Sequence, residues 1–245
     1  HMFNQNSLYY PYPSMRHSIY AKRGMVATSQ PLAAQAGLEI LKKGGNAIDA
    51  AIAAAACLTV VEPTSNGIGS DAFALVWTNG KLHGLNASGF SPKNLSIETL
   101  REQGYEKIPE TGWASVTVPG APAAWAQLSE RFGNLPLTEV LKPAIEYAKN
   151  GYPVSYTLGR LWALEYERFK RILKGEEYQY WFDTFAPNGR APYIGEVWAS
   201  PDHAKTLEII AQTNAEAFYR GEIAEKIAQF AKETNGYITA DDLAE

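Results

Sequence analysis

The fold is decided by Val61-Glu62-Pro63-Thr64-Ser65-Asn66-Gly67-Ile68-Gly69-Ser70-Asp71-Ala72-Phe73-Ala74-Leu75-Val76, which joins an alanine-rich helical pair to a hairpin. Before this stretch, Asn46 is placed to cap a helix over residues 47–61. Pro63 ends that helix, because the residue before a proline avoids helical backbone angles. After the stretch, an Asn-Gly pair at 79–80 separates two short apolar runs and tolerates the positive φ angles of a tight turn. The expected order is helix, loop and antiparallel strand pair.

The other turn signals predict an α+β chain with a mostly helical second half. Ser29 and Pro31 indicate the start of a first helix that stops at the Gly-Gly pair 44–45. A short strand is expected over residues 115–118. Apolar periodicity predicts further helices over residues 96–102, 121–131, 137–149, 156–174, 204–212 and 217–232.

Composition limits the partners that are expected. The chain has 245 residues, 22 basic against 26 acidic, and a net charge of −4 without a basic stripe. It is therefore expected to bind neither nucleic acid nor an anionic membrane surface. No apolar run reaches the roughly 18 to 20 residues of a membrane span. Cys57 is the single cysteine and is interpreted as a packing residue in the alanine-rich run. Residues 3–16 lack the basic-then-apolar pattern of a signal peptide, so a reducing, cytoplasmic setting is expected.

Motifs for cofactors and metals are weak. Residues 67–72 fit G-x-G-x-x-A, but a helix precedes them and a strand follows, the reverse of a dinucleotide fingerprint. They are interpreted as a tight turn, or as a loop lining a pocket in which Asp71 orients its neighbours. His17, His83 and His203 are scattered and lack metal-ligand spacing. No G-x-S-x-G elbow offers a nucleophilic serine.

The end of the sequence looks interrupted. Thr239 and the acidic residues after it form the start of a capped helix, yet the sequence stops at Glu245. Residues 1–245 are therefore interpreted as one C-terminally incomplete domain portion, either a processed half or a truncated chain. Residues 1–2, a His-Met pair, are interpreted as a cloning remnant.

Several segments, read in order, resemble one family. Beyond the opening stretch they are Val118-Pro119-Gly120-Ala121-Pro122, Phe132-Gly133-Asn134-Leu135-Pro136, Lys142-Pro143-Ala144-Ile145-Glu146-Tyr147-Ala148-Lys149-Asn150-Gly151, Ala217-Phe218-Tyr219-Arg220-Gly221-Glu222-Ile223-Ala224 and Ile238-Thr239-Ala240-Asp241-Asp242-Leu243-Ala244. Their order and their amino-acid sequences are similar to those of the large subunit of the gamma-glutamyltransferase family, a family of self-cleaving N-terminal-nucleophile hydrolases. The resemblance spans nearly the whole chain and implies the large-subunit portion of an αββα sandwich.

The resemblance also implies where the chemistry lies. Such a precursor cuts itself and exposes a threonine at the start of the small subunit, which attacks an amide with its own α-amine as base. Neither a metal nor an organic cofactor is needed. The nucleophile and the oxyanion donors belong to the other half, so no catalytic residue is assigned here. The small subunit of the same precursor is the expected partner.

One departure from the family concerns the substrate. Within Leu85-Asn86-Ala87-Ser88-Gly89-Phe90-Ser91-Pro92, the resemblance places an arginine and a glutamate where Ser88 and Gly89 stand. In gamma-glutamyl enzymes that arginine clamps the glutamyl α-carboxylate. A charge-assisted contact of this kind is worth about 1.5 to 3 kcal/mol, so its loss weakens gamma-glutamyl recognition by roughly 10 to 150-fold. Ser88 and Asn86 are the candidate substrate-binding residues.

Two further segments, Gly69-Ser70-Asp71-Ala72-Phe73 and Tyr10-Pro11-Tyr12-Pro13-Ser14, resemble a divergent branch with oxamate amidohydrolases and gamma-glutamyltransferase-like cephalosporin acylases. Both kinds of enzyme cleave an amide whose acyl side bears a carboxylate, so an anion must be neutralised. Arg16 and Arg23 are the first candidate cations, with ordinary surface arginines as the alternative. The leading hypothesis is an amidohydrolase for oxamate or a similar small acidic amide.

Two alternatives stay open. One is a glutaryl-cephalosporin acylase or a gamma-glutamyl transferase or hydrolase, which an arginine reaching the Ser88 pocket from elsewhere would favour. The other is an inactive structural relative, which predicts a second half without the nucleophilic threonine.

Overall fold

The structure is a computed structural model and describes residues 12–14 and 16–245. The expected remnant at 1–2 and part of the 10–14 motif lie outside these residues. The helices are α1 (Pro31–Lys42), α2 (Ala47–Val61), α3 (Ile97–Glu102), α4 (Ala121–Phe132), α5 (Leu137–Val140), α6 (Lys142–Asn150), α7 (Tyr156–Ile172), α8 (Gln179–Phe185), α9 (Pro201–Thr213), α10 (Glu216–Arg220), α11 (Glu222–Glu233) and α12 (Ala240–Ala244), with 3-10 turns η1 (Trp113–Ser115) and η2 (Glu176–Tyr178). The strands are β1 (Ala72–Thr78), β2 (Lys81–Ala87), β3 (Tyr152–Pro153) and β4 (Val197–Trp198).

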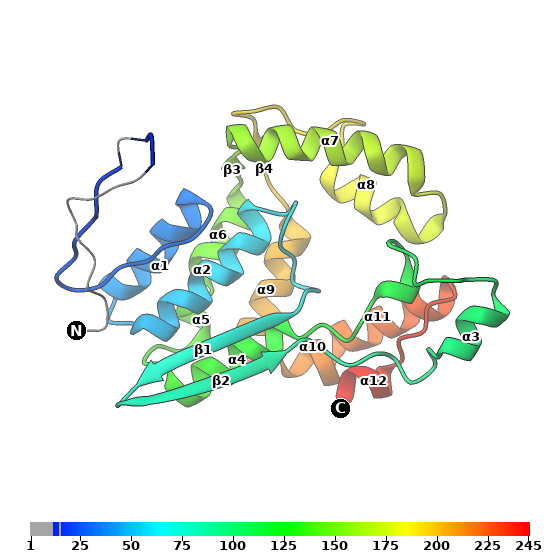
Figure 1. Cartoon of the computed structure of the whole chain (residues 1–245), viewed down its shortest axis with the longest axis horizontal. Helices are drawn as coiled ribbons and strands as arrows, with labels where there is room; N and C mark the ends of the chain where they lie inside the picture. Colours follow the sequence, from blue (N-terminus) through cyan, green and yellow to red (C-terminus); the bar gives the residue numbers. More distant parts are fainter. Residues whose placement is uncertain (1–11, 15) are drawn as a thin grey trace.

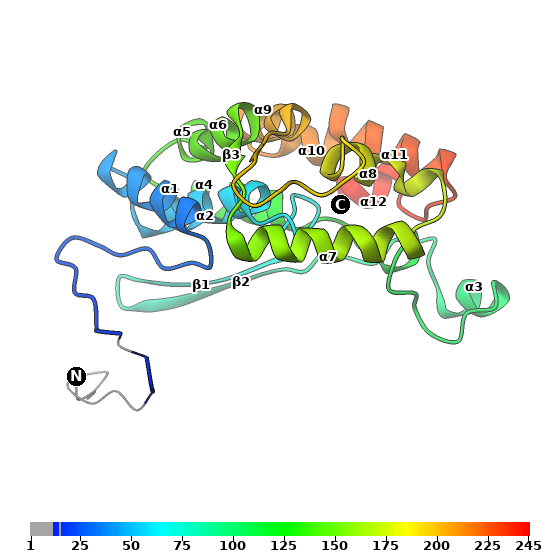
Figure 2. The ribbon, with the colours of Figure 1, turned by 90° about the horizontal axis from the view of Figure 1, so that it is seen from above.

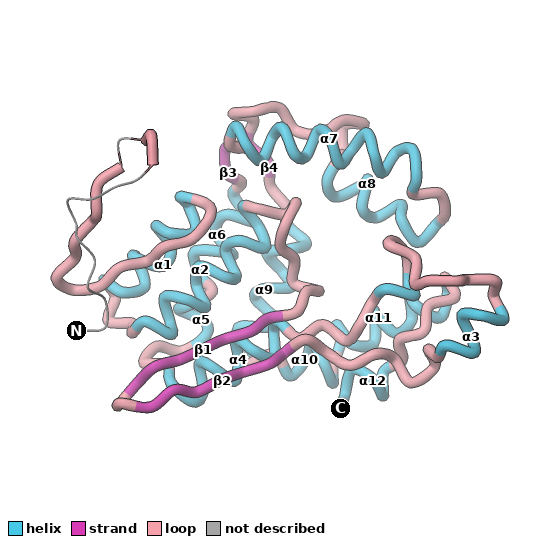
Figure 3. Tube along the Cα trace, in the orientation of Figure 1, coloured by secondary structure: helices cyan, strands magenta, loops and turns pink. Residues whose placement is uncertain are grey.

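The elements lie in layers. Figure 1 shows the β1–β2 hairpin across the front of the helices, with the arm made by α7 and α8 above it. Seen from above, the hairpin and α7 lie on one side of α2, and α5, α6 and α9 lie on the other (Figure 2). Figure 3 shows how little of the chain is strand. The α+β class and the mostly helical second half are therefore confirmed.

The first two helices begin with side-chain caps. Asn46 caps α2, as predicted, by accepting hydrogen bonds from the Ile48 and Asp49 amides at 3.1 and 3.0 Å. The cap of α1 is Gln30 and not Ser29, because the Gln30 side chain reaches the Leu32 amide at 2.6 Å. The Ser29 hydroxyl instead donates to Glu62 beyond the end of α2, at 2.9 Å.

The alanine-rich helix α2 forms the centre of the core. Its alanines allow α1 and α6 to approach closely, and Ala53, Ala56 and Cys57 are at most 1% exposed. Burial raises the pKa of the Cys57 thiol to about 12, so the thiol stays protonated at neutral pH. The interpretation of Cys57 as a packing residue is confirmed.

Asp49 in the first turn of α2 ties two distant turns together. Its Oδ2 accepts hydrogen bonds from the amides of Asn46 at 3.0 Å, Asn134 at 2.9 Å and Leu135 at 3.3 Å. Asn46 reaches the same region by donating from Nδ2 to the Phe132 carbonyl at 2.6 Å. The turn between α1 and α2 is thereby fixed to the turn between α4 and α5.

The hairpin forms as predicted and has two unlike faces. Asn79 and Gly80 take φ angles of 51° and 71°, the left-handed region that a two-residue turn requires. The inner face packs against α4. The outer face is apolar and exposed, with exposed fractions of 65% for Phe73, 78% for Leu75 and 66% for Trp77. Within the described residues each of the two sheets has two strands, so the αββα sandwich stays a prediction for the whole protein.

Three segments after the hairpin differ from the sequence prediction. The strand expected over 115–118 is wrong: η1 occupies its start, and the Val118 amide pairs only with the Phe90 carbonyl at 2.9 Å. The helix expected over 137–149 divides into α5 and α6, because Pro143 takes a first-turn position in α6, where no amide hydrogen is needed. Gly221 likewise separates α10 from α11.

Buried aromatic rings attach the arm of α7 and α8, which the sequence only partly indicates, to the body. Trp162 of α7 is 1% exposed and donates from Nε1 to the Phe185 carbonyl at 2.8 Å. Its ring meets that of Trp198 in β4 at 5.0 Å, and Trp198 in turn meets Tyr152 in β3 at 5.9 Å. Edge-to-face contacts of this kind add to the free energy gained by burying the rings.

His203 of α9 is a partly buried histidine that stays neutral at pH 7. The Thr59 hydroxyl donates to the Ala56 carbonyl at 2.7 Å and lies 3.1 Å from His203 Nε2, so the histidine N–H is the donor to Thr59. Burial lowers the pKa of His203 to about 4.

This histidine should make folding stability depend on pH. Between its unfolded pKa near 6.5 and its folded pKa of about 4, the unfolded chain binds the extra proton. The free energy of unfolding therefore falls as pH drops through this window, by about 3 kcal/mol in all. Denaturant unfolding at pH 7 and pH 4 should show a smaller loss for His203→Gln than for the unchanged protein. Equal losses would contradict a histidine that folding keeps neutral.

Candidate substrate site at the end of strand β2

A cavity of about 570 Å³ lies where β2 ends. Asn86, Ser88 and Gly89 line it from one side, and the segment 118–120 lines it with parts of α4, α10 and α12 from the others. The two candidate residues chosen from the sequence, Asn86 and Ser88, are thus brought to one wall. Both side chains are exposed.

A local turn fixes Asn86 against Ser88. The Asn86 side-chain oxygen accepts a hydrogen bond from the Ser88 amide at 2.9 Å, which closes an Asx turn and ends the strand. The Ser88 carbonyl lies 3.5 Å from the hydroxyl of Thr117, which donates to it. These two contacts hold the backbone of Ser88, a lining residue of the cavity.

Gly89 allows two backbones to touch. It takes a φ of +78°, and a Cβ placed on it would overlap the carbonyl oxygen of Val118. Gly120 meets the same restriction from the other side, because its Cβ would overlap the Ala87 carbonyl. The end of β2 therefore lies directly on residues 118–120 with no side chain between them. A glutamate at position 89, as the family resemblance implies for gamma-glutamyl enzymes, does not fit this loop.

The glycine-containing stretch after α2, residues 67–70, contacts the start of α4, next to the segment 118–120 that lines the cavity. The Ser70 carbonyl accepts hydrogen bonds from the amides of Gly120 at 3.1 Å and Ala121 at 2.9 Å, at the start of α4. The Ser70 hydroxyl donates to the Gly67 carbonyl at 2.7 Å. The interpretation of residues 67–70 as a turn is confirmed, and Asp71 does not line the cavity.

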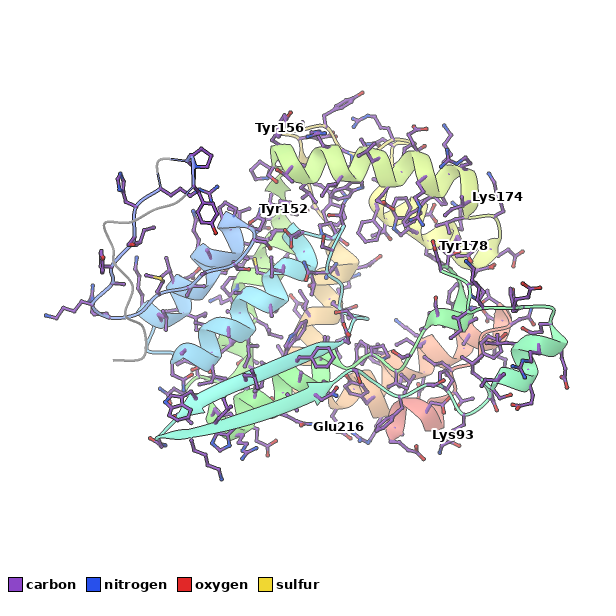
Figure 4. The ribbon with its side chains drawn as sticks, viewed as in Figure 1. Lys93, Tyr152, Tyr156, Lys174, Tyr178 and Glu216 are labelled. Carbon is purple, nitrogen blue, oxygen red and sulfur yellow. The ribbon has the colours of Figure 1, made fainter. Side chains whose placement is uncertain are left out.

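The cavity wall carries one guanidinium and several carboxylates. Arg220 at the end of α10 lines it, and its Nη1 pairs with Glu216 Oε2 at 3.0 Å. The carboxylates on the wall are those of Glu130, Glu216, Asp242 and Glu245. Figure 4 shows Glu216 and Lys93 along the edge of the molecule near the end of the chain. A substrate carboxylate entering this cavity has Arg220 as its cationic neighbour among the described lining residues.

Contacts with the segment after β2 already engage two of these carboxylates. Asp242 accepts hydrogen bonds from the amides of Thr239 at 2.9 Å and Lys93 at 3.1 Å. Burial raises the pKa of Asp242, but these hydrogen bonds outweigh it and hold the pKa below its ordinary value. Glu245 pairs with the Lys93 ammonium group. The cap predicted at Thr239 is confirmed, and it holds α12 against the cavity.

The two arginines chosen in the sequence analysis are not among the lining residues of this cavity. Arg16 and Arg23 are both exposed in the segment before α1. Arg23 lines a different hollow, over α1 and α2, which shares no lining residue with the Ser88 cavity. The end of β2 points away from this segment (Figure 1). Sequence reasoning missed Arg220, although it stands beside Gly221 in a segment that carried the family resemblance.

Comparison with known proteins decides the family. The model of the family described as gamma-glutamyltranspeptidase matches residues 33–245. The chain belongs to the gamma-glutamyltranspeptidase family. The family predicted from the ordered sequence segments is thereby confirmed, and the chain corresponds to the large-subunit portion of this family.

Individual members of the gamma-glutamyltranspeptidase family align along nearly the whole chain. The crystal structure of cephalosporin acylase from Bacillus halodurans is 61% identical with a TM-score of 0.93, over 99% of this chain and 45% of that one. A gamma-glutamyltranspeptidase from Pseudomonas nitroreducens in complex with L-DON is 33% identical with a TM-score of 0.81, over 92% of this chain and 65% of that one. The glutathione hydrolase-like YwrD proenzyme of Bacillus subtilis strain 168 is 37% identical over 231 residues, or 93% of this chain.

The chain spans 42% of the YwrD proenzyme, so these relatives contain much that this sequence does not. Among the described residues, no group of three or more histidine, cysteine, aspartate or glutamate side chains is placed to hold a metal ion. No helix in the described part of the chain has the length and hydropathy of a membrane span.

Proposed function

We propose that the protein containing this chain is a self-processing amide hydrolase of the acylase kind. Its substrate is an amide whose acyl side ends in a carboxylate, with a glutaryl-cephalosporin preferred over oxamate and over gamma-glutamyl compounds. The observation that carries this proposal is the end of β2, where Ser88 stands at the cavity and Gly89 lies against the Val118 carbonyl. This loop offers no cation for a glutamyl α-carboxylate.

The proposed reaction uses the half of the protein beyond this chain. A threonine hydroxyl oxygen attacks the amide carbon while the threonine α-amine takes the hydroxyl proton. The carbon–nitrogen bond then breaks, and the amine leaves with that proton. Water hydrolyses the resulting ester, releasing the acid and restoring the threonine. Donors held in place in the folded site stabilise the negative charge on the tetrahedral oxygen.

This chain contributes the shape of the cavity and one guanidinium, that of Arg220, which stands among four carboxylates and pairs with Glu216 in the absence of substrate. The cavity at the end of β2 holds the acyl group, and Arg220 is the proposed anchor for its far carboxylate. An acyl chain of glutaryl length suits an anchor from α10, on another wall of the cavity than Ser88. Oxamate is a shorter molecule and gains less from such an anchor. The 61% identity to a cephalosporin acylase supports the same preference.

The remaining half also completes the proposed sandwich. The outer face of the hairpin, with Phe73, Leu75 and Trp77 exposed, supplies an apolar surface for further strands and helices. The small subunit of the same precursor is the proposed occupant. This arrangement places the nucleophile and the cavity on one assembly.

The test is a comparison of kcat/KM values for the full-length, self-processed protein. We expect the glutaryl-cephalosporin to exceed both oxamate and a gamma-glutamyl anilide. Arg220→Met should lower kcat/KM for the glutaryl substrate about 10-fold, chiefly through KM, and change the oxamate value less. Arg171→Met, on the exposed end of α7, is the matched control.

Other outcomes identify the alternatives. A preference for oxamate that Arg220→Met leaves unchanged would restore the small-amide hypothesis. A preference for the gamma-glutamyl anilide would mean that another cation performs the clamping. Failure of the precursor to cleave itself, together with a second half lacking the threonine, would show an inactive relative.

A further inference from the structure

A second cavity, of about 280 Å³, lies between the α7–α8 arm and the loop that follows α2. It shares no lining residue with the cavity at the end of β2. Figure 4 marks the arm, with Tyr156 at the start of α7 and Lys174 and Tyr178 near its far end. Four aromatic rings line the cavity: Trp162, Phe169, Trp181 and Phe185.

These rings bound the cavity from several directions. Phe169 and Trp181 meet at 84° with centroids 4.8 Å apart, and Trp162 and Phe185 meet at 65° and 5.9 Å. Trp181 and Phe185 are tilted by 39° at 5.5 Å. The planes of these rings are therefore inclined to one another and do not form a parallel stack. The face of an aromatic ring carries partial negative charge and attracts a cation within about 6 Å of the centroid.

The walls are fixed before any ligand binds. Trp162 is buried and donates from Nε1 to the Phe185 carbonyl at 2.8 Å, which joins α7 to α8. Phe185 also stacks on Trp198 of β4, with centroids 5.7 Å apart and planes 17° apart. A site whose walls are already held costs less ordering free energy when it binds a small molecule.

The polar groups at this cavity favour a positive ligand. Glu165 of α7 lines it and shares the Arg168 guanidinium with Glu110, at distances of 3.2 and 3.3 Å. Glu165 is the one charged side chain among the described lining residues, and Arg168, which pairs with it, lies over the Phe169 ring at 5.5 Å. The Thr64 hydroxyl oxygen also belongs to a lining residue, is buried and has no hydrogen-bond partner within the described structure.

We propose that this cavity binds a small organic cation through a quaternary or methylated ammonium group. Its 280 Å³ far exceeds the roughly 10 to 15 Å³ that one water molecule needs by this measure, so a headgroup of several heavy atoms fits. The rings attract the positive charge without hydrogen bonds, and Glu165 adds a Coulombic attraction. An anion would meet both the ring faces and the carboxylate, which repel it.

Choline and its uncharged isostere 3,3-dimethyl-1-butanol separate charge from shape. Isothermal titration calorimetry on the full-length, self-processed protein should show choline binding at least about fivefold more tightly than the alcohol. Glu165→Gln should weaken choline binding about fivefold and leave the alcohol unchanged. Glu167→Gln, exposed on the same helix and outside the cavity, should change neither.

A second variant tests the rings themselves. Trp181 is only partly buried, so Trp181→Leu should keep the fold while weakening choline more than the alcohol. Equal affinity for both compounds would overturn the proposal in favour of a plain apolar pocket. If the unchanged protein does not bind choline, the proposal is overturned as well. One cause of that result would be that the rest of the precursor fills the cavity. The readout is binding, so it is independent of whether the proposed hydrolase activity is correct.

Discussion

Replacing Gly89 by alanine should lower the free energy of unfolding by about 4 kcal/mol. Part of this loss comes from the φ of +78°, which costs a residue with a Cβ about 1 to 2 kcal/mol. The rest comes from overlap of the new methyl group with the Val118 carbonyl, because a backbone contact cannot move aside like a flexible side chain. Overpacking of this kind costs about 1 to 3 kcal/mol. Denaturant unfolding followed by tryptophan fluorescence measures the sum.

Gly104→Ala is the matched control. Gly104 has a similar φ of +85°, yet no atom lies within 4 Å of the position that its Cβ would take. We expect this variant to lose only the backbone part, about 1 to 2 kcal/mol. Gly89→Ala should also lower kcat/KM, since the loop that carries Ser88 must shift. Equal losses of stability in the two variants would show that β2 does not lie against residues 118–120 as described.

Replacing Asp49 by alanine should cost a similar amount, about 4 kcal/mol. The substitution leaves the partly buried amides of Asn46, Asn134 and Leu135 without their carboxylate acceptor. Hydrogen bonds to a charged group contribute about 1.5 to 3 kcal/mol each, and losing a helix cap adds to the cost. The three contacts share one oxygen, so their contributions do not simply add.

Asp49→Asn separates the acceptor from the charge. All three amides bond to Oδ2, and no hydrogen bond in the described structure reaches Oδ1. An asparagine can place its carbonyl oxygen where Oδ2 lies, so this variant should lose about half as much stability as Asp49→Ala. Thermal unfolding of the two variants in one buffer measures the difference. Equal losses would assign the effect to the charge and not to hydrogen bonding.

The local parts of the fold were predictable because short-range chemistry determines them. The Asn46 cap fixes the start of α2, and the Asn79–Gly80 pair fixes the turn of the hairpin. The strand expected at 115–118 failed because a strand needs a partner, and β-branched residues alone do not supply one. The Gln30 cap was missed because glutamine is an unusual cap, while the neighbouring Ser29 is a favoured type.

The site was only half predictable for the same reason. Asn86 and Ser88 lie within one turn, so their proximity follows from the sequence. Arg220 reaches the same cavity from more than a hundred residues away, and its role depends on how α10 packs. The aromatic cavity under α7 also depends on packing, because α8 and the loop after α2 must meet over the same space. Periodicity places rings on a helix face but not the space between two helices.

The outer face of the hairpin has a practical consequence for anyone who produces this segment by itself. Three large apolar side chains are open to water, and each strand of the hairpin has one edge without a strand partner among the described residues. Such surfaces recruit further copies through edge pairing and apolar contact. The isolated segment is therefore expected to aggregate or to be retained by chaperones during expression. Soluble yield should rise when the remainder of the proposed precursor is synthesised in the same cell, because its apolar surface then competes with self-association.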